Sequence, residues 1–69
     1  MVEVFKTDVY EEEKSLAIVE TLLQYFPDNE INFDLQDCDK ILRIEGENVL
    51  SERIKELLNE AGHRCEVLD

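Results

Sequence analysis

Two cysteines are the side chains of this sequence best suited to binding a soft metal ion. Cys38 and Cys65 stand far apart in the chain and form no Cys-x-x-Cys pair. Tight binding of Cu(I) or Zn(II) needs thiolates or imidazoles that converge on one point, and a disulfide framework needs more cysteines and an oxidising compartment. We therefore expect two free thiols, with Cys65 pointing into the core, and no tight soft-metal site.

Carboxylates near the N-terminus could instead serve a harder cation. Asp8, Glu11 and Glu12 lie in one short stretch, and His63 is the only imidazole of the chain. If the fold returned His63 to this stretch, the four side chains could bind a divalent cation weakly. The other interpretation, which we favour, is that the acids stabilise a helix N-terminus and that His63 is a surface residue beside a glycine turn.

Catalysis has little support in the sequence. A serine or cysteine nucleophile needs an adjacent base, and His63 is the one histidine available for that role. No glycine-rich loop that could hold a phosphate is present, because the chain contains only two glycines. We therefore expect a non-enzymatic protein without a cofactor.

Acidic residues dominate the charge. Eighteen Asp and Glu against seven Lys and Arg give a formal net charge of −11. Nucleic acids and anionic membranes attract Lys and Arg, so this charge argues against both as partners, while a basic protein surface stays compatible with it. No apolar run reaches membrane-spanning length, and Met1 leads directly into a strand-like segment rather than a signal peptide. A cytoplasmic protein is expected.

A predicted β-hairpin at residues 31–46 organises the single domain expected for residues 1–69. Ile31, Phe33 and Leu35 alternate with polar residues before the polar stretch 37–40, and Leu42 and Ile44 alternate with polar residues after it. Period-two alternation on both sides of a polar turn is typical of two strands with one buried face. Because a hairpin alone is marginally stable, helices must cover that face.

A strand and a helix are predicted before the hairpin. Residues 2–7 form the strand, with the register open: either Val2 and Val4 face the core, or Phe5 does. The Asp8-x-x-Glu11 pattern fits a capping box that starts the helix, and Pro27 ends it. The helix carries one apolar stripe, which two further residues widen, so it should pack against both the sheet and a second helix. The stripe is Leu16, Val19, Leu23 and Phe26, and the widening residues are Ile18 and Leu22.

A second helix over roughly residues 50–61 and a last strand over residues 63–68 complete the chain, with Gly62 as a left-handed C-cap between them. The element order β-α-β-β-α-β predicts an α+β, ferredoxin-like sandwich: a four-stranded sheet of order 4-1-3-2 with both helices on one face. The expected core is Leu16, Val19, Leu23, Phe33, Leu35, Leu42, Ile44, Ile54 and Leu58.

Three segments, 33–35, 42–46 and 57–63, resemble the heavy-metal-associated domain family of copper chaperones and metal-pumping ATPases. The last two are similar to the family's glycine at the end of strand 3 and to its Ala-Gly-Tyr turn, with His63 in place of tyrosine. The family's Met-x-Cys-x-x-Cys metal motif would fall on Tyr10, Glu12 and Ser15, none of which is a soft ligand. The resemblance therefore implies the fold and not the family's metal carriage.

The sequence thus predicts a protein-interaction module, monomeric or weakly dimeric, with an unknown protein partner. The sheet face that the helices leave uncovered is the expected docking surface, with Phe5, Ile41, Arg43 and Arg64 as its candidate contacts. The alternative is a weak divalent-cation-binding or metal-sensing accessory protein that uses Asp8, Glu11, Glu12 and His63.

Overall fold

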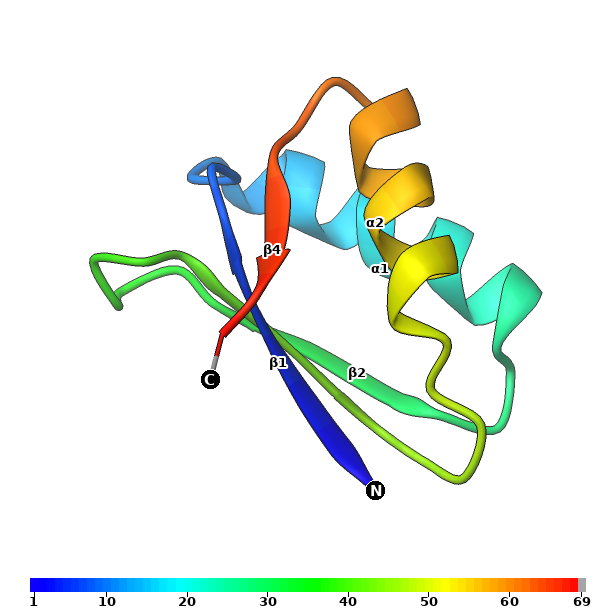
Figure 1. Cartoon of the computed structure of the whole chain (residues 1–69). Coiled ribbons are helices and arrows are strands. Elements are labelled where there is room, and N and C mark those ends of the chain that lie inside the picture. The colour runs from blue at the N-terminus through cyan, green and yellow to red at the C-terminus, as the bar shows by residue number, and fades with distance from the viewer. Residues whose placement is uncertain (69) are drawn as a thin grey trace.

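The computed structural model describes residues 1–68 and has the predicted element order (Figure 1). A single four-stranded sheet carries two helices on one of its faces, and this arrangement is a ferredoxin-like α+β sandwich. The elements are β1 (Val2–Thr7), α1 (Glu12–Tyr25), β2 (Glu30–Asp34), β3 (Ile41–Glu45), α2 (Ser51–Glu60) and β4 (Cys65–Val67). No helix among the described residues is long and apolar enough to cross a bilayer.

The sheet has the order β2-β3-β1-β4, which confirms the predicted topology, and every neighbouring pair is antiparallel. The register of β1 is now fixed. Phe5 lies opposite Leu42 of β3, and both side chains are fully buried beneath the helices. Val2 and Val4 therefore point to the uncovered face. Phe5 cannot be part of a docking surface there, so this predicted contact was wrong.

Helix α1 begins at Glu12, with Glu11 as its N-cap and no side-chain capping bond. The predicted capping box was therefore wrong, because the carboxylate of Asp8 is used elsewhere. The predicted core face of this helix was also wrong in part. Ile18 and Leu22 are buried, whereas Leu16 and Leu23 are 59% and 38% exposed.

Helix α2 ends as the sequence predicts. Gly62 has a φ of +89°, a left-handed conformation that suits glycine. Its N–H donates to the Asn59 carbonyl over 2.9 Å, and the His63 N–H donates to the Leu58 carbonyl over 2.9 Å. This pair of bonds is the Schellman motif, and it turns the chain back toward β4.

The core lies between the sheet and the two helices. Leu42, Ile44, Ile54 and Leu58 are fully buried as predicted, while Val19, Phe33 and Leu35 are only partly buried against them. The other core residues come from β1, α1, β2, α2 and β4 and from the loop before each helix, and they are Phe5, Val9, Ile18, Leu22, Ile31, Val49, Leu57 and Cys65. A core this small leaves the domain with modest stability.

Candidate functional site

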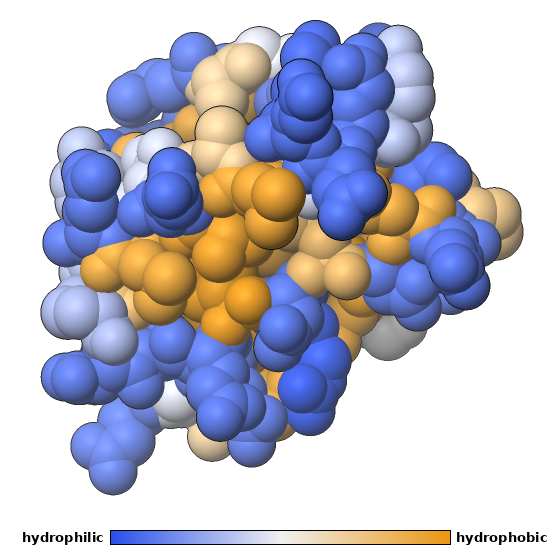
Figure 2. Space-filling view, turned by 180° about the vertical axis from the view of Figure 1, so that it is seen from behind, coloured by the Kyte–Doolittle hydropathy of each residue, from blue (hydrophilic) through white to orange (hydrophobic). Residues whose placement is uncertain are grey.

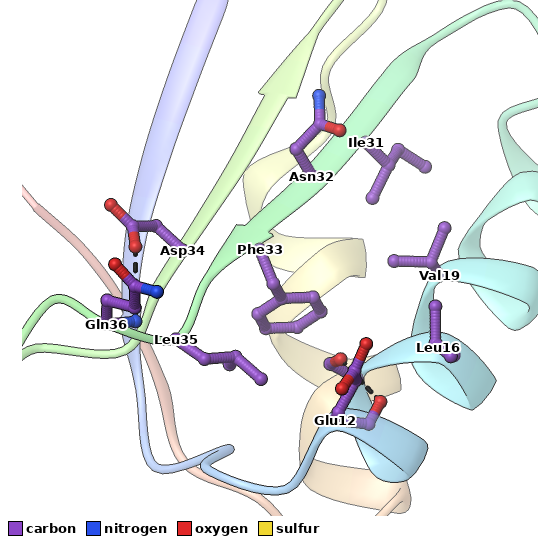
Figure 3. Close-up of a pocket in the computed structure, with 10 residues that line it drawn as sticks. Glu12, Leu16, Val19, Ile31, Asn32, Phe33, Asp34, Leu35 and Gln36 are labelled. Carbon is purple, nitrogen blue, oxygen red and sulfur yellow. Dashed lines mark hydrogen bonds between the residues drawn. The ribbon is translucent and has the colours of Figure 1, made fainter.

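A groove of about 680 Å³ runs between the N-terminal half of α1 and strand β2. Figure 2 shows the molecule from behind, with a broad hydrophobic surface bordered by hydrophilic side chains. In the close-up of Figure 3, Phe33 and Leu35 point from β2 toward α1, while Asn32 and Asp34 point away from it. The lining residues are Glu12, Ser15, Leu16, Val19, Ile31, Asn32, Phe33, Asp34, Leu35 and Gln36.

The groove exists because α1 carries more apolar surface than the sheet covers. Ile18 and Leu22 lie on the stripe that packs into the core. Leu16 and Val19, which lie on the neighbouring stripe, line the groove beside β2, and of the two only Val19 packs against the edge of the core. Leu16 is 59% exposed, so an apolar side chain that helix periodicity assigns to the interior faces water instead.

Strand β2 forms one edge of the sheet, so one side of its backbone has no neighbouring strand. The Gly46 N–H donates to the Met1 carbonyl over 3.0 Å, which marks these residues as a hydrogen-bonded pair of β1 and β3. Such pairs alternate along an antiparallel ladder, so the main-chain N–H and C=O groups of Arg43 and Glu45 point to β2. There they pair with the main-chain groups of Asn32 and Glu30, respectively.

By the same alternation, the main-chain N–H and C=O groups of Ile31 and Phe33 point away from β3, along the free edge. No turn, loop or side-chain hydrogen bond within residues 1–68 involves them. Unpaired edge groups of this kind are a template for pairing with another extended chain.

Charge near the groove is negative. Its lining includes the carboxylates of Glu12 and Asp34 and no Lys or Arg. Glu30 lies at the start of β2 and shares the uncovered sheet face with Asn32 and Asp34, since residues two apart in a strand point the same way. Strand β2 therefore presents an apolar row on its helix side and an acidic row on the other side.

The predicted cation ligands are brought together only in part. His63 Nδ1 lies 3.0 Å from Asp8 Oδ1, and the Arg64 N–H donates to the same oxygen over 3.0 Å. Glu11, by contrast, is the N-cap of α1 and lies 3.9 Å from the Lys14 ammonium, while Glu12 lines the groove. Asp8 thus ties the loop before α1 to the turn before β4, and its oxygen is already engaged.

The pKa of Asp8 reflects these contacts. Partial burial raises the pKa of this carboxyl, but the hydrogen bonds from the Arg64 amide and the His63 ring, with the charge of His63, outweigh burial and hold the pKa below its ordinary value of 3.8. Since the folded-state pKa is lowered, the contribution to stability is present above the unfolded-state pKa and is lost as the pH falls through the folded-state value.

Asp8→Asn is therefore expected to lower the free energy of unfolding at pH 7 by less than about 1 kcal/mol, because the carboxylate is half exposed and screened by solvent. The difference from wild type should shrink as the pH falls below the ordinary value of 3.8 and through the lower folded-state pKa, because Asp8 is then protonated. Urea unfolding at pH 7 and pH 3 measures both effects, with Asp28→Asn at an exposed acid as the control. A difference that stays constant across this range would contradict the assignment.

The two thiols lie in different surroundings. Cys65 is buried, and burial raises its pKa to about 12, so it stays a neutral thiol. Cys38 is exposed at the hairpin tip. Asp37, Cys38 and Asp39 form the one group of three metal-ligand-type side chains within residues 1–68 whose ligand atoms lie within 4.8 Å of one another. The Asp37 carboxylate accepts the Asp39 N–H over 2.8 Å, and Asp39 lies 3.8 Å from the Lys6 ammonium, so turn geometry accounts for this cluster.

The uncovered sheet face holds the remaining predicted docking residues. Ile41 is half-buried, and Arg43 is exposed with its guanidinium 3.4 Å from the Glu45 carboxylate. Arg64 precedes β4 and is exposed. Val2 and Val4 of β1 also lie on this face. The sequence could not show this, because it left two registers of the strand open. The sequence missed the groove beside β2 entirely, although the doubled apolar stripe of α1 was the signal for it.

Comparison with known proteins adds no relative. No family model, no curated protein and no solved structure matches this chain. The resemblance to heavy-metal-associated domains remains a prediction from the sequence, and the function is argued from the geometry of the site.

Proposed function

We propose that this chain is a non-catalytic protein-binding module that docks its partner in the groove between α1 and β2. The observation that carries the proposal is the 59% exposure of Leu16 in a groove that the partly buried Phe33 also lines. Apolar side chains grouped around a hollow, with a polar rim, are typical of interaction sites. A net charge of −11 favours a partner whose contact surface is basic.

The uncovered sheet face is the competing surface, but it has fewer apolar side chains that could anchor a partner. Apart from Val2, its exposed side chains are polar or of mixed charge, and Arg43 is already beside Glu45. Charged pairs at an exposed surface contribute little to affinity, whereas apolar anchors in a hollow contribute most of it. The groove therefore replaces the sheet face as our docking surface.

Leu16→Asp is the variant that tests the proposal. It places a charge in the groove without removing a buried side chain, so the fold should survive and the partner should be lost. Thr21→Asp is the matched control, because it adds the same charge at an exposed position of α1 outside the groove lining. Arg43→Glu tests the competing sheet face.

Quantitative affinity capture from the source cells should identify proteins that wild type and Thr21→Asp retain and that Leu16→Asp loses. With that partner purified, Leu16→Asp should weaken the measured Kd by about tenfold or more, as expected for an anchor residue. If Leu16→Asp binds as tightly as wild type, or if Arg43→Glu alone abolishes binding, the groove is not the docking site.

A further inference from the structure

We infer that the occupant of the groove is an extended segment of a partner protein that pairs with β2 as a fifth strand and alternates apolar with basic residues. This inference rests on the proposed function and specifies its binding mode. Its basis is that the free main-chain edge of β2 and the apolar groove lie side by side, so one extended chain can use both.

Main-chain pairing with β2 determines which residues of the added strand face the groove. The N–H and C=O groups of Ile31 and Phe33 point along the free edge, so an antiparallel strand can form up to four hydrogen bonds with them. The two residues of the added strand that lie opposite them then share the face on which Ile31 and Phe33 point, which is the helix side. These two side chains would enter the groove, against Leu16 and Val19, and must be apolar.

The acidic row of β2 determines the charge of the residues of the added strand that point to the uncovered sheet face. The residues of the added strand opposite Glu30 and Asp34 point to the uncovered sheet face, and opposite charges directly across two strands stabilise their pairing. Asn32, between them, has no charge to match. The segment recognised thus has the five-residue pattern basic, apolar, polar, apolar, basic.

A second copy of this chain fits the edge less well. Pairing two β2 strands antiparallel about Asn32 would place Glu30 of one copy opposite Asp34 of the other, twice per dimer. Like charges directly opposite one another are destabilising, and each copy brings a net charge of −11 to the contact. The same two carboxylates that attract a basic segment therefore discourage self-pairing.

Synthetic peptides with the core Lys-Val-Thr-Val-Lys, blocked at both ends, test the inference directly on the isotope-labelled 69-residue chain. Amide chemical-shift changes should concentrate on β2 and on the first half of α1. Hydrogen exchange of the Ile31 and Phe33 amides should slow at least tenfold at saturating peptide, because these are the amides that gain partners. The peptide with Glu in place of both Lys should bind at least tenfold more weakly.

Backbone methylation separates strand pairing from simple apolar contact. Methylating the two valine nitrogens removes the donors that face β2 and should weaken binding at least tenfold. Methylating the threonine nitrogen makes the same chemical change on an amide that faces away, and should change the affinity less than threefold. The double variant Glu30→Lys with Asp34→Lys should reverse the preference between the Lys and Glu peptides.

The results distinguish the binding mode from the proposed function. Equal affinity of both methylated peptides, or the absence of chemical-shift changes in the groove at millimolar peptide, would overturn strand pairing. The effect of Leu16→Asp on binding of the native partner tests the location of the docking site independently. A dimer in sedimentation equilibrium, with the Ile31 and Phe33 amides protected before peptide is added, would assign the edge to a second copy and overturn the inference.

Discussion

Leu22→Ala is expected to remove most of the free energy of unfolding of the protein, whereas Leu23→Ala is expected to leave that free energy nearly unchanged. Leu22 is fully buried, and truncating such a leucine costs about 2–5 kcal/mol. A core of this size supplies only about 3–5 kcal/mol in total. Leu23 is 38% exposed at the groove side of the same helix, and its truncation should cost less than about 1 kcal/mol.

Urea unfolding followed by far-ultraviolet circular dichroism measures the two variants side by side. The pair is internally matched, because the residues are adjacent, chemically identical and equally helical. A larger loss for Leu23→Ala than for Leu22→Ala would mean that α1 is rotated about its axis relative to the structure described above, and that the groove is lined by different residues.

Gly46→Ala is the second substitution with a large expected effect. A Cβ at this position would overlap Asn29 Oδ1 and lie 2.6 Å from Asn29 Cγ, so the asparagine side chain must move. Overpacking of this kind costs about 1–3 kcal/mol. Gly62→Ala should also destabilise, but for a different reason, since its Cβ would meet nothing and only the positive φ is strained.

The double variant Asn29→Ala with Gly46→Ala identifies the cause. Asn29 Nδ2 is buried without a hydrogen-bond partner among the described residues, so removing this amide should cost little. If the clash with Asn29 is responsible, the double variant should recover most of the stability that Gly46→Ala alone loses. Simple addition of the two losses would show instead that the clash with Asn29 is not the cause of the destabilisation.

The sheet and α2 were predictable because their signals are local. Leu42 and Ile44 alternate with polar neighbours, and a strand admits only two faces, so the buried face follows once one side is covered. Ile54 and Leu58 lie on the one apolar side of α2, and Gly62 marks its end. Each of these predictions uses residues within a few positions of one another.

Helix α1 was harder because its apolar residues cover two adjacent stripes. Periodicity shows that Leu16 and Leu22 are both on apolar stripes, but the choice between stripes depends on how far β2 extends beneath the helix. Only the assembled sheet decides this, and it selects Ile18 and Leu22. The stripe left over, with Leu16 on it, became a wall of the groove, so the error in the predicted core coincides with the candidate site.

Asp8 shows the other limit of sequence interpretation. Its spacing to Glu11 matches a capping box, and the local pattern holds no hint of a competing partner. His63 lies 55 positions further along the chain, yet its ring and the Arg64 amide form the hydrogen bonds with the Asp8 carboxylate. The predicted sheet order places β4 beside β1, so the approach of His63 to Asp8 was predictable, whereas the loss of the capping bond was not.

The buried thiol of Cys65, on the shortest strand, can report detachment of β4 from the sheet, because it becomes accessible to thiol reagents when β4 opens. Within residues 1–68, strand β4 pairs with β1 over a shorter stretch than any other pair of neighbouring strands. While β4 is in place, the Cys65 thiol is shielded and uncharged, and thiol reagents cannot reach it. Cys38 is exposed, so it should react first, and a Cys65 that reacts faster than the whole domain unfolds would report detachment of the last strand from an otherwise intact sheet.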